Sequence, residues 1–146
     1  MGRIAVTDGM DDVAVRILET AGHEVVLRHY EPEELRCGAL ADFDAVVVRS
    51  ATKMTSDAID ASCKEGVLGF IGRAGVGVDN IDIGAATRNG VVVCNTPGAS
   101  TNSVVELTIG HLIASTRFVA RADRTLRTGN WAKTVSYTHL TLPTKA

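Results

Sequence analysis

The chain has 146 residues, which is the length of about one domain. Hydrophobic residues make up 45% and charged residues 22%, proportions that exclude a wholly disordered chain and favour a folded globular one. The 15 basic residues against 17 acidic residues give a net charge of −2, which excludes a strongly basic surface for nucleic acid or an anionic membrane.

Membrane and secretory classes are excluded on other grounds. The apolar runs are far shorter than the ~20 residues of a membrane span, and the N-terminus has neither a signal peptide nor a myristoylation signal. The odd number and wide spacing of Cys37, Cys63 and Cys94 predict neither a disulfide framework nor a zinc site. We expect buried or half-buried thiols and a cytoplasmic protein without a bound metal.

Strand and helix signals alternate along the first two thirds of the chain. Short apolar runs predict strands at residues 3–7, 24–27, 45–48, 67–71 and 91–94. Helical spacing or capping residues predict helices over residues 10–21, from Pro32, from Ser56 and over residues 83–88, with Gly22 closing the first. The run at 45–48 has no polar residue and is expected to be buried on both faces. This order predicts an α/β fold with a doubly wound, mostly parallel, flavodoxin-like sheet.

One long helix is expected after this sheet, over residues 102–128. Ser103 and Glu106 fit a capping box at its start. Apolar residues are expected on one face, and these are Val105, Ile109, Leu112, Val119 and Leu126. Such a face needs a large partner, so a second domain or another subunit should cover it.

A glycine-rich loop, Gly72-Arg73-Ala74-Gly75-Val76-Gly77, follows the fourth predicted strand. It is not a dinucleotide fingerprint, because Asn80 stands where G-x-G-x-x-G requires its third glycine. Two interpretations stay open from the residues alone. The bare amides form a nest for a carboxylate or phosphate, or the loop is a plain tight turn.

Two arginines follow neighbouring predicted strands, Arg49 after residues 45–48 and Arg73 after residues 67–71. The carboxyl ends of parallel strands face the ligand crevice of an open sheet. Arg49 and Arg73 would therefore converge with the glycine loop on an anion, since guanidinium groups suit carboxylates and phosphates. The alternative is that both arginines are ordinary surface residues.

Other polar residues favour structural roles. The four histidines, His23, His29, His111 and His139, show neither metal-ligand spacing nor a nucleophile motif. Asp8, Asp11 and Asp12 could suggest the acidic pocket of a phosphoreceiver domain, but Arg49 and Ser50 stand where that class requires an aspartate. We expect these three carboxylates to cap the first helix.

Three stretches together resemble the D-2-hydroxyacid dehydrogenases: residues 48–52 (VRSAT), 72–82 (GRAGVGVDNID) and 93–106 (VCNTPGASTNSVVE). The resemblance implies two α/β domains with a cleft between them. It assigns residues 1–98 to the first part of the substrate domain and 99–133 to the first helix of the NAD domain, which takes part in dimer contacts. It also implies a homo-oligomer.

The resemblance further implies the roles of individual residues. Arg49, with Ser50 beside it, and Arg73 would face the acid or phosphate groups of a small hydroxy acid substrate. The backbone amides of Ala74, Gly75, Val76 and Gly77 would hold the substrate carboxylate, and Val76 would lie nearest the NAD cofactor.

Departures from the family pattern matter as much as the likeness. The sequence has no G-x-G-x-x-G, no catalytic Arg and no Glu–His pair after Lys133, and residues 135–144 resemble a translated sequencing adapter. We therefore expect an inactive fragment of a dehydrogenase with a non-native tail at 134–146. The alternative is a stand-alone flavodoxin-like module that binds an anion or a partner protein.

Overall fold

The computed structural model describes residues 1–64 and 66–131 and divides into two compact units, Met1–Ala99 and Ser100–Ala146. The tail expected to be non-native lies outside the described residues. The first unit is a five-stranded, all-parallel sheet in the order β2-β1-β3-β4-β5, which confirms the predicted α/β class. Its strands are β1 (Arg3–Val6), β2 (Glu24–Leu27), β3 (Ala45–Val48), β4 (Phe70–Arg73) and β5 (Val92–Asn95).

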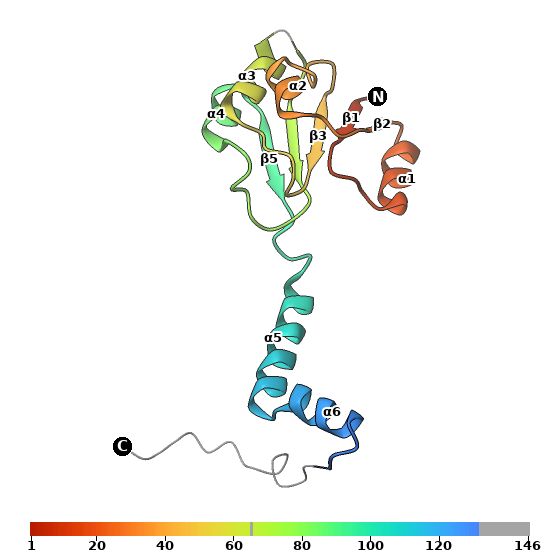
Figure 1. The fold of residues 1–146 in the computed structure, drawn as a ribbon. Helices are drawn as coiled ribbons and strands as arrows, with labels where there is room; N and C mark the ends of the chain where they lie inside the picture. The colour runs from red at the N-terminus through yellow and green to blue at the C-terminus, as the bar shows by residue number, and fades with distance from the viewer. Residues whose placement is uncertain (65, 132–146) are drawn as a thin grey trace, which may run out of the picture. The chain divides into compact units, whose positions relative to one another are not determined.

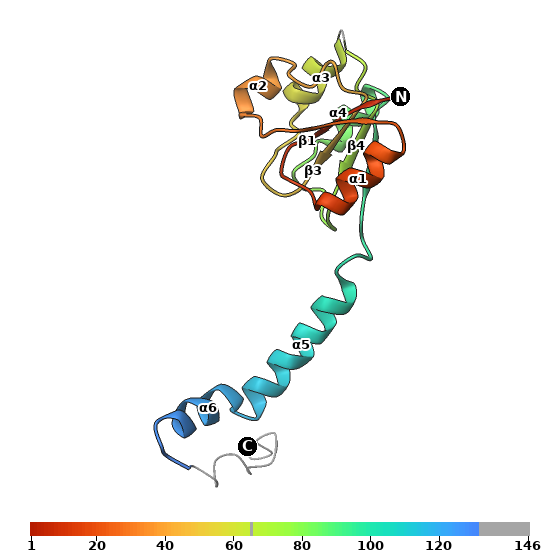
Figure 2. The ribbon, with the colours of Figure 1, turned by 90° about the vertical axis from the view of Figure 1, so that its right-hand side faces the viewer.

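Helices lie on both sides of this sheet. They are α1 (Asp12–Thr20), α2 (Pro32–Arg36), α3 (Ser56–Lys64) and α4 (Ile83–Arg88). Helices α2, α3 and α4 gather on one face, whereas α1 lies on the other, beside β2 (Figures 1 and 2). Right-handed crossovers place α1 and α2 on opposite faces. The connection from β1 to β2 runs one way along the sheet, and the connection from β2 to β3 runs back past β1 in the other direction.

The two faces of the sheet are covered unequally. Val46, Val48 and Ile71 share the face under α2–α4 and are fully buried. On the opposite face Ala45 and Val47 are only half-buried, and Val92 on β5 is 56% exposed. The prediction that β3 is buried on both faces is wrong here, because α1, the helix on this face, contacts β2 and not β3.

Local sequence signals set most helix boundaries. Asp11 caps α1 through the Val13 amide, and Asp82 caps α4 through the Ala85 amide. A capping box between Glu31 and Glu34 starts α2. Gly22 after α1 has φ +89°, a left-handed conformation that glycine adopts without a steric cost.

Several predictions of detail are wrong. Strand β4 begins at Phe70 rather than at residue 67, because pairing of Phe70 with Ala45 sets its register. Strand β5 lies one residue later than expected. Cys63 is half-buried as predicted, but Cys37, which follows α2, and Cys94, on the open face of the sheet, are exposed.

The second unit holds two helices instead of the single one predicted. Helix α5 (Thr101–Thr116) and helix α6 (Val119–Arg127) are separated at Phe118, whose φ of 53° is left-handed and cannot continue a helix. The capping box is also wrong, since Ser103 lies inside α5 and Ser100 precedes it. None of the described helices is long and apolar enough to cross a membrane.

Apolar residues surround α5 instead of following one face. Its exposed apolar side chains are those of Val104, Val105, Leu107, Ile109, Leu112 and Ile113. At 100° per residue these positions are spread around the helix circumference. Neither α5 nor α6 has a buried residue, and a helix that is apolar all round is typical of an interior position.

Candidate anion-binding site

Two arginines lie at the carboxyl edge of the sheet, at the ends of adjacent strands. Val48, the last residue of β3, pairs with Arg73, the last residue of β4, and Arg49 follows Val48 directly. Arg73 is therefore part of its strand instead of following it. The structure brings Arg73 and Ser50 together, with Arg73 Nη2 donating to Ser50 Oγ at 3.3 Å.

Neither arginine is neutralised within the described part of the chain. Arg49 and Arg73 take part in none of the ion pairs there. The Nε of Arg73 is buried with no hydrogen-bond partner among these residues. The side chain of Arg73 folds over Gly75, where an added Cβ would overlap its guanidinium group. The guanidinium groups of Arg49 and Arg73 thus form no ion pair among the described residues, and an external anion could pair with them.

The glycine-rich loop offers fewer free amides than its sequence suggests. The amide of Ala74 donates to the Val48 carbonyl at 2.9 Å, and that of Gly75 donates to the Arg73 carbonyl at 2.8 Å. The amides of Val76 and Gly77 make no such bond within the residues described. These two amides, and not all four, are available to a ligand.

Hydrogen bonds from the end of β5 fix the glycine-rich loop. Asn95 Nδ2 donates to the Val76 carbonyl at 2.7 Å, and the Thr96 amide donates to the Gly75 carbonyl at 2.9 Å. With its carbonyls engaged, the loop presents its free amides and the side chain of Val76, which is 48% exposed.

Asp8, at the end of β1, holds the loop that carries Arg49. Its Oδ2 accepts hydrogen bonds from the amides of Arg49 (2.7 Å) and Thr52 (3.0 Å), and its Oδ1 accepts one from Thr52 Oγ1 (2.6 Å). Partial burial alone would raise the pKa of Asp8. The hydrogen bonds from Thr52 and Arg49, with the charge of His29, outweigh burial and lower that pKa below its usual 3.8. The prediction that Asp8 caps α1 is wrong, because Asp11 does so.

Asn80 and Thr52 were not expected at the site. Asn80 Nδ2 donates to the carbonyls of Arg49 (2.8 Å) and Thr52 (2.7 Å), and Thr52 is buried. The useful sequence signal for Asp8 and Thr52 was their position after β1 and β3, at the edge where Arg49 lies. For Asn80 the signal was its place near the end of the glycine-rich loop.

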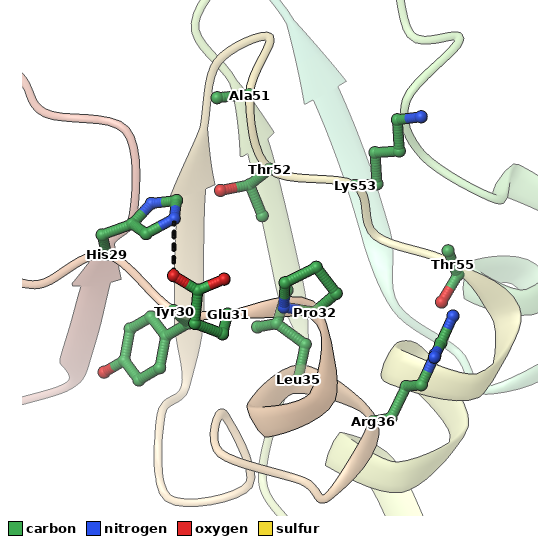
Figure 3. Close-up of a pocket in the computed structure, with 10 residues that line it drawn as sticks. All are labelled: His29, Tyr30, Glu31, Pro32, Leu35, Arg36, Ala51, Thr52, Lys53 and Thr55. Atoms are coloured by element: carbon green, nitrogen blue, oxygen red, sulfur yellow. Dashed lines mark ion pairs between the residues drawn. The ribbon is translucent and has the colours of Figure 1, made fainter.

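A hollow of about 460 Å³ lies next to the Arg49–Thr52 loop (Figure 3). The segments after β2 and β3 line it, including His29, Glu31, Thr52 and Lys53. His29 Nε2 lies 4.0 Å from the Glu31 carboxylate, an ion pair when the imidazole is protonated. Arg36, which also lines the hollow, pairs with Glu33 at 2.6 Å, so the hollow has fewer basic side chains without an acidic partner among the described residues than the edge with Arg49 and Arg73 has.

Comparison with known proteins decides the family. A family model described as D-isomer specific 2-hydroxyacid dehydrogenase, catalytic domain, matches residues 4–144. The chain belongs to this family. It is 46% identical over 131 residues to the D-3-phosphoglycerate dehydrogenase of Methanocaldococcus jannaschii, covering 90% of this chain and 24% of that protein. It is 43% identical over 132 residues to the hydroxypyruvate reductase of Thermotoga maritima, covering 90% of this chain and 42% of the relative.

A solved structure of the dehydrogenase family supports the fold. The NAD+-bound 3-phosphoglycerate dehydrogenase of Entamoeba histolytica superimposes with a TM-score of 0.64 at 39% identity. The superposition covers 80% of this chain and 39% of that chain. This chain therefore spans only about a quarter of its curated relative from Methanocaldococcus and less than half of the other two proteins.

Proposed function

We propose that this chain forms the substrate-binding part of an NAD-dependent dehydrogenase that oxidises a small D-2-hydroxy acid. The observation that carries the proposal is the pair Arg49 and Arg73, which lie at the carboxyl ends of adjacent strands without an acidic partner among the described residues. The free amides of Val76 and Gly77 add hydrogen-bond donors in the loop after Arg73. Membership in the 2-hydroxyacid dehydrogenase family supplies the class of substrate that such donors would bind.

Each group has a role that its chemistry supports. The amides of Val76 and Gly77 would donate to the substrate carboxylate, with the guanidinium group of Arg73 beside them over Gly75. Arg49 and Ser50 would bind the acidic group at the other end of the substrate. Holding both ends restricts the rotation of the substrate and orients its C2 carbon for reaction.

The cofactor that we propose is NAD, which when bound accepts the hydride from C2. The residues of this chain fit only one edge of such a site. The half-exposed Val76 offers an apolar surface, but the sequence has no G-x-G-x-x-G to hold the pyrophosphate and no Glu–His pair to take the hydroxyl proton. We therefore propose that the chain by itself is inactive.

The substrate that we propose is 3-phosphoglycerate, oxidised to 3-phosphooxypyruvate in serine biosynthesis. The Methanocaldococcus and Entamoeba proteins are phosphoglycerate dehydrogenases, whereas the Thermotoga relative is a hydroxypyruvate reductase. Two guanidinium groups at one edge suit the carboxylate and phosphate of 3-phosphoglycerate better than the single carboxylate of hydroxypyruvate.

We further propose that the complete enzyme is a cytoplasmic homo-oligomer. Support comes from α5, whose apolar side chains surround it and are exposed in this unit. An apolar surface of this kind is typically covered by another domain or subunit. The NAD domain and a second subunit would cover different sides of α5.

The alternative, a stand-alone module that binds an anion without catalysis, makes a different prediction. Both proposals require an anion at Arg49 and Arg73, but only the dehydrogenase requires that the bound anion be presented correctly to NAD. An activity test on a protein that contains a complete NAD domain separates the two.

A chimera provides this test. The 131 aligned residues of this chain replace their counterparts in the Methanocaldococcus phosphoglycerate dehydrogenase. We expect NADH formation with 3-phosphoglycerate, and no activity from the original chain alone. The matched control is the same chimera with Arg49→Ala and Arg73→Ala. A folded chimera that binds NAD but does not oxidise 3-phosphoglycerate, D-glycerate or D-lactate would contradict the proposal.

A further inference from the structure

The carboxylate of Asp8 contacts no group that the proposed reaction uses directly, yet it binds the site loop tightly. It accepts three hydrogen bonds, from the Arg49 amide, the Thr52 amide and Thr52 Oγ1, at 2.7, 3.0 and 2.6 Å. Two of these donors are backbone groups three residues apart. This is how a turn of backbone amides binds an external anion.

The position of Asp8 in the sheet makes this arrangement informative. In the order β2-β1-β3-β4-β5 the connections reverse direction between β1 and β3, which is the point where open α/β sheets place their ligands. Here Asp8, which follows β1, already accepts the hydrogen bonds of the Arg49 and Thr52 amides, which follow β3. The chain's own carboxylate is thus bound at this point of the sheet, and the guanidinium groups of Arg49 and Arg73 remain for an external anion.

Asn80 holds the same two residues from the other side. Its Nδ2 donates to the carbonyls of Arg49 and Thr52 at 2.8 and 2.7 Å, from the loop between β4 and α4. Because both backbone carbonyls are acceptors, the side-chain group of Asn80 that faces them must be its NH2 group and not its oxygen. The backbone N–H and C=O of Arg49 are therefore both engaged, by residues from two different loops.

From these contacts we propose that Asp8 and Asn80 are positioning residues, which fix the backbone of Arg49 so that its guanidinium group meets the substrate anion. The inference rests on the proposed function, in which Arg49 binds substrate. With its backbone fixed, Arg49 loses only side-chain freedom when the anion binds, which favours affinity. Neither residue touches the substrate itself.

Variants of the full chain test this role. Asp8→Asn keeps the shape of the side chain but removes its charge and turns one acceptor into a donor, and Asn80→Asp removes the Nδ2 donor. The matched control is Asp11→Asn, which alters a carboxylate that also accepts a backbone amide, at 2.8 Å, but caps α1 instead of holding Arg49. Thermal unfolding of all variants identifies any that lose the fold.

Two measurements are made on each variant: hydrogen exchange of the Arg49 and Thr52 amides, and the dissociation constant for 3-phosphoglycerate by NMR titration. We expect Asp8→Asn and Asn80→Asp to weaken binding by about 5- to 30-fold, the cost of fixing the backbone of one residue when the anion binds. Asp8→Asn should also expose both amides to exchange. Asp11→Asn should leave both measurements unchanged.

A double-mutant comparison separates positioning from a general structural effect. If Asp8 acts through Arg49, Asp8→Asn should weaken binding no further in a chain that already carries Arg49→Ala. Equal weakening in both backgrounds, or wild-type affinity in Asp8→Asn alone, would overturn the positioning role. A wild-type chain without saturable binding of 3-phosphoglycerate would instead overturn the proposed function, and the inference with it.

Discussion

Replacing Gly75 by alanine should remove Arg73 from the substrate site without unfolding the protein. A Cβ at this position would overlap Nη1 and Cζ of Arg73. The atoms in its way belong to the end of a flexible side chain, and the φ of Gly75 is outside the left-handed region that penalises alanine. The guanidinium group should therefore swing away, whereas the backbone stays in place.

The size of the effect follows from what Arg73 would contribute. Loss of one charge-assisted hydrogen bond costs ~1.5–3 kcal/mol, which corresponds to ~10–150-fold in substrate affinity. The cost to folding should be small, because Arg73 makes a single side-chain hydrogen bond among the described residues, at 3.3 Å to Ser50. We expect the unfolding free energy to change by less than about 1 kcal/mol.

The assay is the dissociation constant of this chain for 3-phosphoglycerate, measured beside its stability to urea. Gly98→Ala is the matched control, because a Cβ there meets no atom within 4 Å. The double variant Gly75→Ala with Arg73→Ala should bind no more weakly than Arg73→Ala alone. Unchanged affinity in Gly75→Ala, or additive losses in the double variant, would refute the reasoning.

Three further predictions concern Arg49, α5 and Asp8. In the active chimera, Arg49→Ala should reduce kcat/KM for 3-phosphoglycerate by ~10–150-fold with NAD affinity unchanged; wild-type kinetics would show that Arg49 is a surface residue. The chain should self-associate through α5, whereas a version ending at Ala99 stays monomeric in size-exclusion chromatography with light scattering; a monomeric full chain would contradict this. Because the folded-state pKa of Asp8 lies below 3.8, its stabilisation should be complete above about pH 5 and lost as the pH falls through that lowered value. Urea unfolding of wild type and Asp8→Asn should therefore differ at pH 7 and converge as the pH falls through that lowered pKa, and a constant difference would argue against ionised Asp8 as the cause.

Elements with local signals were the ones that the sequence predicted well. Helix α4 has Asp82 at its start and Gly90, with φ +71°, after its end, so its boundaries depend on neighbouring residues. Strands β2 and β3 contain apolar runs, residues 25–27 and 45–48, with polar residues on both sides. By contrast, β4 is set by pairing of Phe70 with Ala45, 25 positions apart by numbering, and the apolar run that begins at residue 67 contains no mark of that register.

The break between α5 and α6 shows a different limit. Phe118 adopts a φ of 53°, yet neither it nor its neighbours Arg117 and Val119 is a glycine or proline that would indicate the end of a helix. The continuous helical spacing of apolar residues therefore predicted a single helix. Only the backbone conformation shows the interruption.

The candidate site likewise has residues that the sequence could predict and residues that it could not. Arg49 and Arg73 could be predicted because strand ends share one edge of a parallel sheet. The role of Asp8 could not, since its partners Arg49 and Thr52 are 41 and 44 residues away and the nearby helix offered an obvious use for a carboxylate. Likewise, the engagement of the Ala74 amide by Val48 depends on the pairing of β3 with β4.

The central claim is that the carboxyl edge of β3 and β4 binds the substrate, and an NMR titration of this chain with 3-phosphoglycerate tests it most directly. We predict saturable shifts that are largest for the amides of Val76 and Gly77 and for the side-chain Nε–H groups of Arg49 and Arg73. Saturable shifts confined to the hollow around His29 and Lys53, or no saturable shifts at all, would contradict the claim.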